Sequence, residues 1–172
     1  WTDPTNPSDI VHFSIENSTK IKRLTNVNED IFYNVEFGKL EEITYTSIDN
    51  KKIQGWIVKP PQFDSNKKYP LVLRIHGGPH SMYHVGFNYN FQLHAAQDQV
   101  LLYTNPRGST GYGYDFANAI QNAYPGNDYD DIMAGVDEVI SKGYIDENKM
   151  YVYGGSGGGV LTSWIVGKTD RF

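Results

Sequence analysis

The pattern of apolar and polar positions changes near residue 37. Before that point, Asp9–Ile15 alternates apolar and polar residues, which is typical of a strand with one buried face. Lys20–Thr25 is the expected hairpin partner, with a turn at Asn17 and Ser18. Two short strands do not form a stable domain alone. We therefore expect residues 1–36 to be the end of a larger β structure.

From Leu40 onward, strands alternate with helices. The expected strands are Glu42–Ser47, Ile53–Val58, Leu71–Ile75, Val100–Tyr103 and Met150–Tyr153, and the expected helices are Tyr89–Gln97, Asp130–Lys142 and Val160–Ile165. The first two strands form an antiparallel hairpin that turns at Asp49 and Asn50. This alternation predicts an α/β fold with a mostly parallel sheet.

Two of the helices have an apolar side. In Asp130–Lys142 the apolar residues recur with the spacing of one helix face, at Ile132, Met133, Val136, Val139 and Ile140. In the last helix we expect a core-facing side made of Val160, Leu161, Trp164 and Ile165.

A glycine-flanked serine lies between the last strand and the last helix. Gly154–Gly158 has the pattern G-x-S-x-G, preceded by the apolar run Met150–Tyr153. Such a turn holds the serine in a strained conformation with its hydroxyl exposed, and the glycines avoid clashes with the neighbouring strand and helix. An anion-binding loop is the alternative, but the spacings of the P-loop and of G-x-G-x-x-G are absent, since residue 160 is Val. The pattern therefore predicts that Ser156 is a nucleophile.

Acyl transfer also needs hydrogen-bond donors for the oxyanion of the tetrahedral intermediate. In α/β-hydrolases one donor is the N–H of the residue after the nucleophile, here Gly157. The second comes from the loop after the third strand, which is often His-Gly-Gly. His76–Pro79 follows Leu71–Ile75 directly and has this sequence. The two motifs together predict a serine hydrolase.

Three segments together resemble the prolyl oligopeptidase family of serine peptidases, and most closely its acylaminoacyl-peptidase and dipeptidyl-peptidase-like branches. They are His76–His80, Asn105–Gly113 and the Gly-Gly-Ser-x-Gly-Gly turn at 154–159. The resemblance implies that residues 1–36 are the end of a β-propeller-like domain. It implies that residues 37–172 are the amino-terminal half of an α/β-hydrolase catalytic domain.

The resemblance also implies an activity, which is cleavage of peptide bonds of short peptides through an acyl-enzyme on Ser156. The N–H groups of Gly78 and Gly157 would form the oxyanion hole. Asn105–Gly113 would be a structural loop near the rim of the active site, with Arg107 tying loops together.

The sequence departs from the family pattern at two positions. Members usually carry a larger residue where this chain has Gly157, so we expect a weaker or looser oxyanion hole here. Lys168 replaces a histidine that is frequent in relatives, which we interpret as a surface difference.

The triad of this fold follows the chain order Ser, then Asp or Glu, then His. After Ser156 the sequence contains one acid, Asp170, and no histidine. We therefore expect the triad acid and base to lie outside these residues, and the chain alone to be inactive. Two alternatives stay open. One is a carboxylesterase with the same nucleophile elbow, which is the G-x-S-x-G turn at Gly154–Gly158. The other is a non-catalytic binding or structural module.

Other polar residues have competing interpretations. A metal site is one interpretation of the fourfold spacing of His76, His80 and His84, but Gly77–Pro79 disfavours a helix there, so hydrogen bonding to the oxyanion segment is favoured. None of the three is expected to be the triad base, and His12 and His94 are expected to be surface or packing residues.

The acidic residues Asp128, Asp130 and Asp131 could bind calcium, but they lie where a helix begins, so capping is favoured. Arg107 could clamp a substrate carboxylate, but the structural role is favoured.

Composition narrows the possible partners. The formal net charge is −5 and no more than two basic residues are adjacent, which disfavours nucleic acid. The absence of cysteine excludes a disulfide framework, a thiolate metal site and a cysteine nucleophile. No apolar stretch is long enough to span a membrane. We expect an oligopeptide or acyl substrate, with no metal and no cofactor.

The sequence starts at Trp1 without an initiator Met or a signal-like segment, so we expect the natural amino terminus to be missing and the compartment to be undecided between cytoplasmic and secreted. We also expect an exposed apolar sheet edge, and hence a need for the remaining part of the hydrolase domain or another chain for stability.

Overall fold

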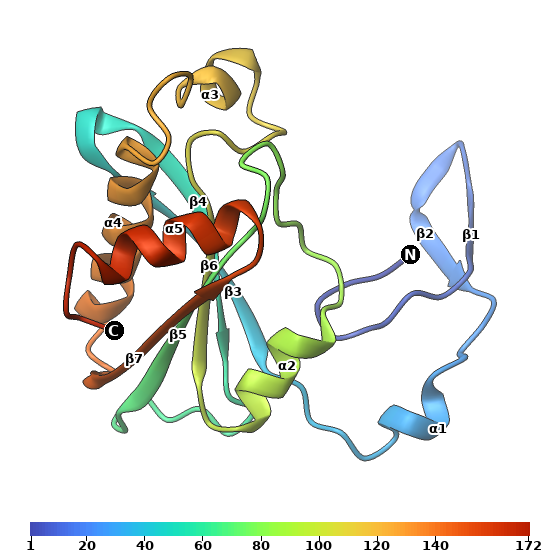
Figure 1. The fold of residues 1–172 in the computed structure, drawn as a ribbon. Helices are drawn as coiled ribbons and strands as arrows, with labels where there is room; N and C mark the ends of the chain where they lie inside the picture. Colours follow the sequence, from blue (N-terminus) through green and yellow to red (C-terminus); the bar gives the residue numbers. More distant parts are fainter.

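The computed structural model describes residues 1–172 and contains two separate β-sheets. The first is an antiparallel hairpin of β1 (Val11–Ser14) and β2 (Asn17–Arg23), which stands away from the main sheet (Figure 1). Its turn consists of Ile15 and Glu16, because Asn17 already pairs with Ser14. The expected turn at Asn17 and Ser18 is therefore wrong. The Ser14 hydroxyl accepts a hydrogen bond from the Glu16 N–H, which supports the earlier turn.

A short helix, α1 (Glu29–Phe32), follows the hairpin and was not expected from the sequence. Its Phe32 ring packs against Phe37 and Phe87, with ring centroids 5.3 and 5.7 Å away. The Gln92 side chain adds a polar link, since its amide donates to Pro4 O and its oxygen accepts from Gly38 N. These contacts attach the amino-terminal segment to the rest of the molecule.

The main sheet has five strands in the order β3-β4-β6-β5-β7. The strands are β3 (Lys39–Thr46), β4 (Lys52–Lys59), β5 (Tyr69–Ile75), β6 (Val100–Asn105) and β7 (Ile145–Gly154). β6, β5 and β7 are parallel, whereas β3 pairs antiparallel with β4 and β4 antiparallel with β6. The predicted α/β fold is confirmed. The predicted turn between β3 and β4 is a 3₁₀ segment, Ile48–Asn50, with Asp49 at φ 55° and Asn50 at φ 60°.

Three helices cover the two faces of this sheet. They are α2 (Tyr89–Ala96), α4 (Asn127–Ser141) and α5 (Gly157–Val166), whereas the short α3 (Tyr114–Asn118) lies beyond the ends of the strands (Figure 1). Alternate strand residues point to opposite faces. Leu71 and Leu73 of β5 belong to the larger core with Ile132 of α4, whereas Val72 belongs to the smaller core with Phe91 of α2. Thus α4 and α5 lie on one face and α2 on the other.

The buried side of α5 is narrower than expected. Leu161 and Ile165 are buried against the sheet, but Val160 is 48% exposed and Trp164 is 39% exposed. Residues 161 and 165 form one row along the helix, and their preceding neighbours lie about 100° around the axis. The expectation that all four residues face the core is therefore wrong. The Lys168 ammonium lies 4.9 Å from the centroid of the Trp164 ring, at the surface.

None of the helices combines the length and the apolar character that crossing a lipid bilayer would require.

Candidate active site

Ser156 occupies a strained turn between the end of β7 and the start of α5. Its backbone has φ 55° and ψ −121°, in a region that residues with a Cβ rarely adopt. The residue is exposed, and its side chain makes no capping hydrogen bond to α5. The hydroxyl is therefore presented at the carboxyl end of the parallel strands, as the sequence pattern predicts.

Two glycines allow this turn to pack against the sheet. A Cβ on Gly154 would lie 2.6 Å from the Gly158 carbonyl, and a Cβ on Gly158 would lie 2.4 Å from Ile75 O at the end of β5. Both distances are far below normal contact, so no other residue fits at either position without a backbone shift. Gly155 has no atom within 4 Å of an ideal Cβ. The predicted role of the flanking glycines is confirmed for Gly154 and Gly158.

The loop that follows β5 lies directly beside the serine. A Cβ on Gly77 would lie 3.4 Å from Ser156 Cβ, and a Cβ on Gly157 would lie 3.1 Å from Gly78 N. The main chains of Gly78 and Gly157 are thus in contact next to Ser156. Neither of their N–H groups donates to an acceptor among the backbone hydrogen bonds of turns and loops.

Gly157 is held firmly. It is buried, an ideal Cβ there would lie 2.7 Å from Gly78 O, and its carbonyl accepts a hydrogen bond of 2.6 Å from the Tyr124 hydroxyl. The weaker or looser oxyanion hole expected from a glycine at this position stays a prediction. The glycine permits a close approach of the two loops that a larger residue would prevent.

Two of the three expected loop histidines hold the oxyanion segment. The His76 ring approaches Gly77 O through Nδ1 at 2.7 Å and Ser109 Oγ through Nε2 at 2.9 Å. His80 Nδ1 lies 3.0 Å from Gly108 O. His84 instead accepts from the N–H of Gly86, two residues along the chain. The three rings have different partners, and no cluster of three or more His, Asp or Glu side chains could hold a metal ion.

The charge state of His76 follows from its surroundings. Burial lowers the pKa of the ring below its ordinary value of 6.5, and the bond to Gly77 opposes this shift only in part. The ring is therefore neutral at neutral pH. Because a carbonyl oxygen only accepts, Nδ1 carries the proton. The bare Nε2 then bonds Ser109 only by taking the single hydroxyl proton that Ser109 otherwise donates to Pro106 O.

Arg107 is a structural tie. It is 4% exposed, and its Nε and Nη2 bond both carboxylate oxygens of Asp131 at 2.8 Å. Its Nη1 also bonds Asp49 at 3.1 Å, and the two carboxylates hold the pKa of Arg107 above its usual range. With its guanidinium occupied in this way, the alternative of a clamp for a substrate carboxylate is wrong.

The three aspartates at the start of α4 do not share one role. Asp131 is fully buried and pairs with Arg107, so the expectation that it caps the helix is wrong. Asp128 accepts from Gly126 N at 2.5 Å, and Asp130 lies in the first turn, where a negative charge complements the helix dipole. The sequence pattern could not separate these roles, because packing in the folded molecule and not the acidic pattern decides which aspartates are buried.

Tyr124 and Ser109 are site residues that sequence reasoning missed. Tyr124 also lines a cavity of about 360 Å³ with Pro79 and His80 of the oxyanion loop. The only sequence signal for Ser109 was its place in the segment Asn105–Gly113.

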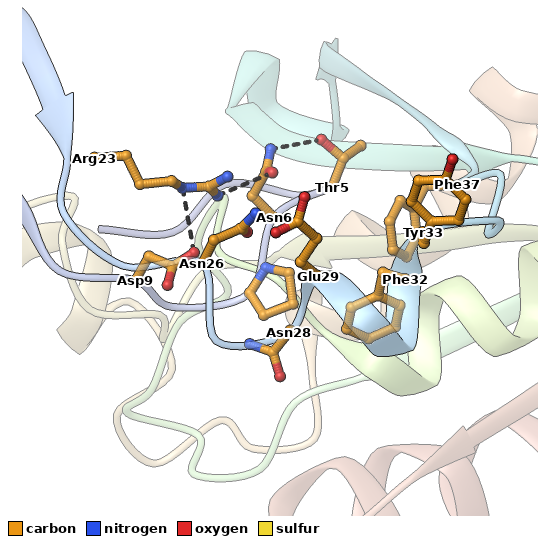
Figure 2. A pocket seen from close by; sticks show the side chains of 11 residues that line it. Thr5, Asn6, Asp9, Arg23, Asn26, Asn28, Glu29, Phe32, Tyr33 and Phe37 are labelled. Carbon is orange, nitrogen blue, oxygen red and sulfur yellow. Dashed lines mark hydrogen bonds and ion pairs between the residues drawn. The ribbon is translucent and has the colours of Figure 1, made fainter.

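A second hollow, of about 270 Å³, lies between the β1–β2 hairpin and α1 (Figure 2). Its polar side contains the ion pair of Arg23 with Asp9 at 3.2 Å, and its apolar side contains Phe32 and Phe37. None of the residues predicted to carry chemistry lines it.

No hydrogen bond joins the Ser156 hydroxyl to a histidine or a carboxylate within residues 1–172. Both nitrogens of His76 have other partners, and His94 bonds Gln99 and Tyr153. His12 lies exposed in β1, in the separate hairpin. The structure therefore brings together a serine and two candidate oxyanion donors.

Comparison with known proteins extends this picture. The sequence profile of the prolyl oligopeptidase family matches residues 85–172, which include the elbow but not the loop at 76–79. The uncharacterized peptidase YuxL of Bacillus subtilis is 43% identical over 172 residues, which cover 99% of this chain and 26% of that protein. Dipeptidyl-peptidase 5 of Schizosaccharomyces pombe is 37% identical over 130 residues, covering 74% of this chain and 19% of that one.

A solved structure of a peptidase shares the fold of this chain. The acylaminoacyl peptidase of Pyrococcus horikoshii superposes with a TM-score of 0.89 at 30% identity, over 99% of this chain and 27% of that one. The chain thus spans about a quarter of the length of these two full-coverage matches. On the strength of the family profile and of the shared fold, this chain belongs to the prolyl oligopeptidase family.

Proposed function

We propose that residues 1–172 belong to a serine peptidase that cleaves peptide bonds of short peptides through an acyl-enzyme on Ser156. We use the term parent protein for a polypeptide that contains residues 1–172 and is as long as the relatives described above. The observation that carries the proposal is the exposed Ser156 at φ 55°, with Gly78 and Gly157 in contact beside it.

The chemistry follows from this arrangement. The Ser156 oxygen attacks the carbonyl carbon of the scissile bond, and its proton passes to a base. The carbonyl oxygen becomes an oxyanion, which the N–H groups of Gly78 and Gly157 stabilise. The C–N bond then breaks, and the base returns the proton to the departing amine. Water attacks the acyl-enzyme in the same way and releases the acid.

The base and the acid that orients it would come from polypeptide outside residues 1–172. In this fold they follow the serine along the chain, and the bonded histidines described above have partners other than Ser156. Under the same proposal residues 1–36 end a β-propeller-like domain, and residues 37–172 form the amino-terminal half of the hydrolase domain.

Preference for peptides over esters is supported by the relatives. Those that cover this part of the chain are named peptidase, dipeptidyl-peptidase 5 and acylaminoacyl peptidase. The elbow itself serves esters equally well, so a carboxylesterase is the alternative that an experiment must exclude.

The experiment compares turnover of peptide anilides with that of nitrophenyl esters by the purified parent protein. Ser156→Ala should abolish both, whereas Ser163→Ala, an exposed serine of α5, should abolish neither. Anilide cleavage supports the peptidase. Cleavage of esters alone would support a carboxylesterase, and no Ser156-dependent turnover would support the non-catalytic alternative.

A further inference from the structure

The Gly77 carbonyl and the Gly78 N–H belong to the same peptide group. Because that group is planar, a bond that fixes the direction of its C=O also fixes the direction of its N–H. His76 Nδ1 lies 2.7 Å from Gly77 O, and a neutral ring donates there. The imidazole therefore holds the peptide that carries the proposed oxyanion donor.

The orientation of that imidazole depends on Ser109. The serine is fully buried, and its Oγ lies 2.9 Å from His76 Nε2 and 2.7 Å from Pro106 O. The backbone N–H of Ser109 donates to the same Pro106 carbonyl at 3.1 Å, which fixes the position of the serine. The edge-to-face contact of the ring with Tyr83, at 5.3 Å, leaves it little freedom to turn.

The segment that carries Ser109 is anchored to the sheet and to α4. Arg107 pairs with the buried Asp131, and the Asn105 side chain accepts from Tyr83 N at 2.8 Å and donates to Tyr83 O at 3.1 Å. Gly108 O receives the second loop histidine, His80. The oxyanion loop is thus attached at three points to one rigid segment, Asn105–Ser109.

We propose that Ser109, acting through His76, is a positioning residue that sets the direction of the Gly78 N–H for the oxyanion. This inference rests on the proposed function. It gives the segment after β6 a part in the reaction, and it distinguishes Ser109 from a residue that merely fills space in the core.

The two roles differ in their kinetic effect. The oxyanion develops charge only in the transition state, so a misdirected donor lowers kcat and leaves KM nearly unchanged. Loss of a whole oxyanion donor lowers kcat about 10²- to 10³-fold, and Ser109→Ala keeps the Nδ1 bond, so we expect a fall of about tenfold. We expect KM to change by less than about twofold.

The experiment measures kcat and KM of the parent protein, its Ser109→Ala variant and a matched control. Ser141→Ala is the control, because Ser141 Oγ also lies 2.7 Å from the carbonyl oxygen three residues earlier, but at the exposed end of α4. A peptide aldehyde, whose adduct with Ser156 carries an oxyanion, should lose affinity for Ser109→Ala in proportion to kcat/KM. It should bind Ser141→Ala as it binds the wild type.

Two variants of His76 give an independent test if Ser109→Ala does not fold. The amide nitrogen of an asparagine replaces Nδ1 approximately, and that of a glutamine replaces Nε2. His76→Asn can therefore still donate to Gly77 O, whereas His76→Gln can reach only Ser109. We expect kcat of His76→Asn to exceed that of His76→Gln about tenfold.

The outcomes separate the inference from the function on which it rests. A Ser109→Ala variant within about twofold of the wild-type kcat, or a loss expressed mainly in KM, overturns the positioning role. Equal kcat in the two His76 variants also overturns it. A wild type without Ser156-dependent hydrolysis contradicts the proposed function and removes the inference with it.

Discussion

At the scale of single residues, the site depends on close approaches between main chains that only glycine permits. Gly158 lies against the last carbonyl of β5, and Gly157 lies against Gly78. These contacts bring the turn of one loop onto the backbone of another. The G-x-S-x-G spacing indicates the close contact of Gly158 with the neighbouring strand. The contact of Gly157 with Gly78 depends on how two segments far apart in sequence meet.

The elbow provides a matched pair of variants. Gly158→Ala places a Cβ 2.4 Å from Ile75 O, so we expect the free energy of unfolding to fall by about 1–3 kcal/mol. Gly155→Ala meets no atom within 4 Å and should change it by less than about 0.5 kcal/mol. Urea denaturation of the parent protein measures both, and equal effects of the two substitutions would refute this account of the turn.

Asp128 predicts a dependence of stability on pH. Burial raises the pKa of its carboxyl above the ordinary value of 3.8, and Oδ2 has no hydrogen-bond partner. A raised folded-state pKa means a contribution to stability that is complete below the unfolded pKa and is lost as the pH rises through the folded pKa.

Asp128→Asn cannot ionise, so its stability relative to the wild type should increase as the pH rises from about 4, near the unfolded pKa, through the folded pKa. Denaturation curves at several pH values measure the difference. A difference that stays constant or falls over this range would contradict the assignment.

At the scale of elements, the order of strands and helices was predictable because each element of the α/β part has its own hydrophobic period. β5, β6 and α4 show this best, since their apolar residues form the two cores. Elements whose apolar residues do not reach a core could not be predicted in this way. The short helix α1 has no buried residue, and α3 has none either.

The dependence on core packing also explains two wrong predictions about single residues, the burial of Trp164 and the capping role of Asp131. Trp164 is apolar but exposed, and Asp131 is charged but buried, because packing against the sheet and not residue type decides which side of a helix is covered. The nucleophile and its glycines could be predicted from a local pattern. The partnership of Ser109 with His76 could not, because the two residues meet only when the loops after β5 and β6 fold together.

The ion pair of Arg107 with Asp131 joins α4 to the loop after β6. Arg107→Ala leaves the buried Asp131 carboxylate without its guanidinium, so we expect a loss of about 3–5 kcal/mol in the free energy of unfolding. The double variant Arg107→Met with Asp131→Leu should recover part of this loss, since no uncompensated charge remains. Urea denaturation of the two variants gives the answer, and a loss below about 1 kcal/mol in Arg107→Ala would show that the pair does not anchor the loop.

At the scale of the whole molecule, β7 is an edge strand of the main sheet and pairs only with β5. Tyr151 and Tyr153 of this strand are exposed, as are Val160, Trp164 and Val166 of the helix that follows. An unpaired strand next to exposed apolar side chains favours association with further polypeptide. We propose that the remaining part of the hydrolase domain covers this edge in the parent protein.

Hydrogen exchange can test that proposal. Amides of β7 that do not pair with β5 should exchange slowly in the parent protein and fast in residues 1–172 alone, which should also self-associate in sedimentation experiments. A monodisperse monomer of residues 1–172 that unfolds cooperatively would contradict the proposal.

We propose that Ser156 is a nucleophile and that the N–H groups of Gly78 and Gly157 hold the oxyanion that forms on the substrate carbonyl. The reaction of the parent protein with a fluorophosphonate, followed by peptide mapping, tests this proposal most directly. We expect one modified residue, Ser156, loss of hydrolysis in proportion to labelling, and no labelling of Ser156→Ala. An unmodified Ser156 in a protein that retains hydrolase activity would contradict it.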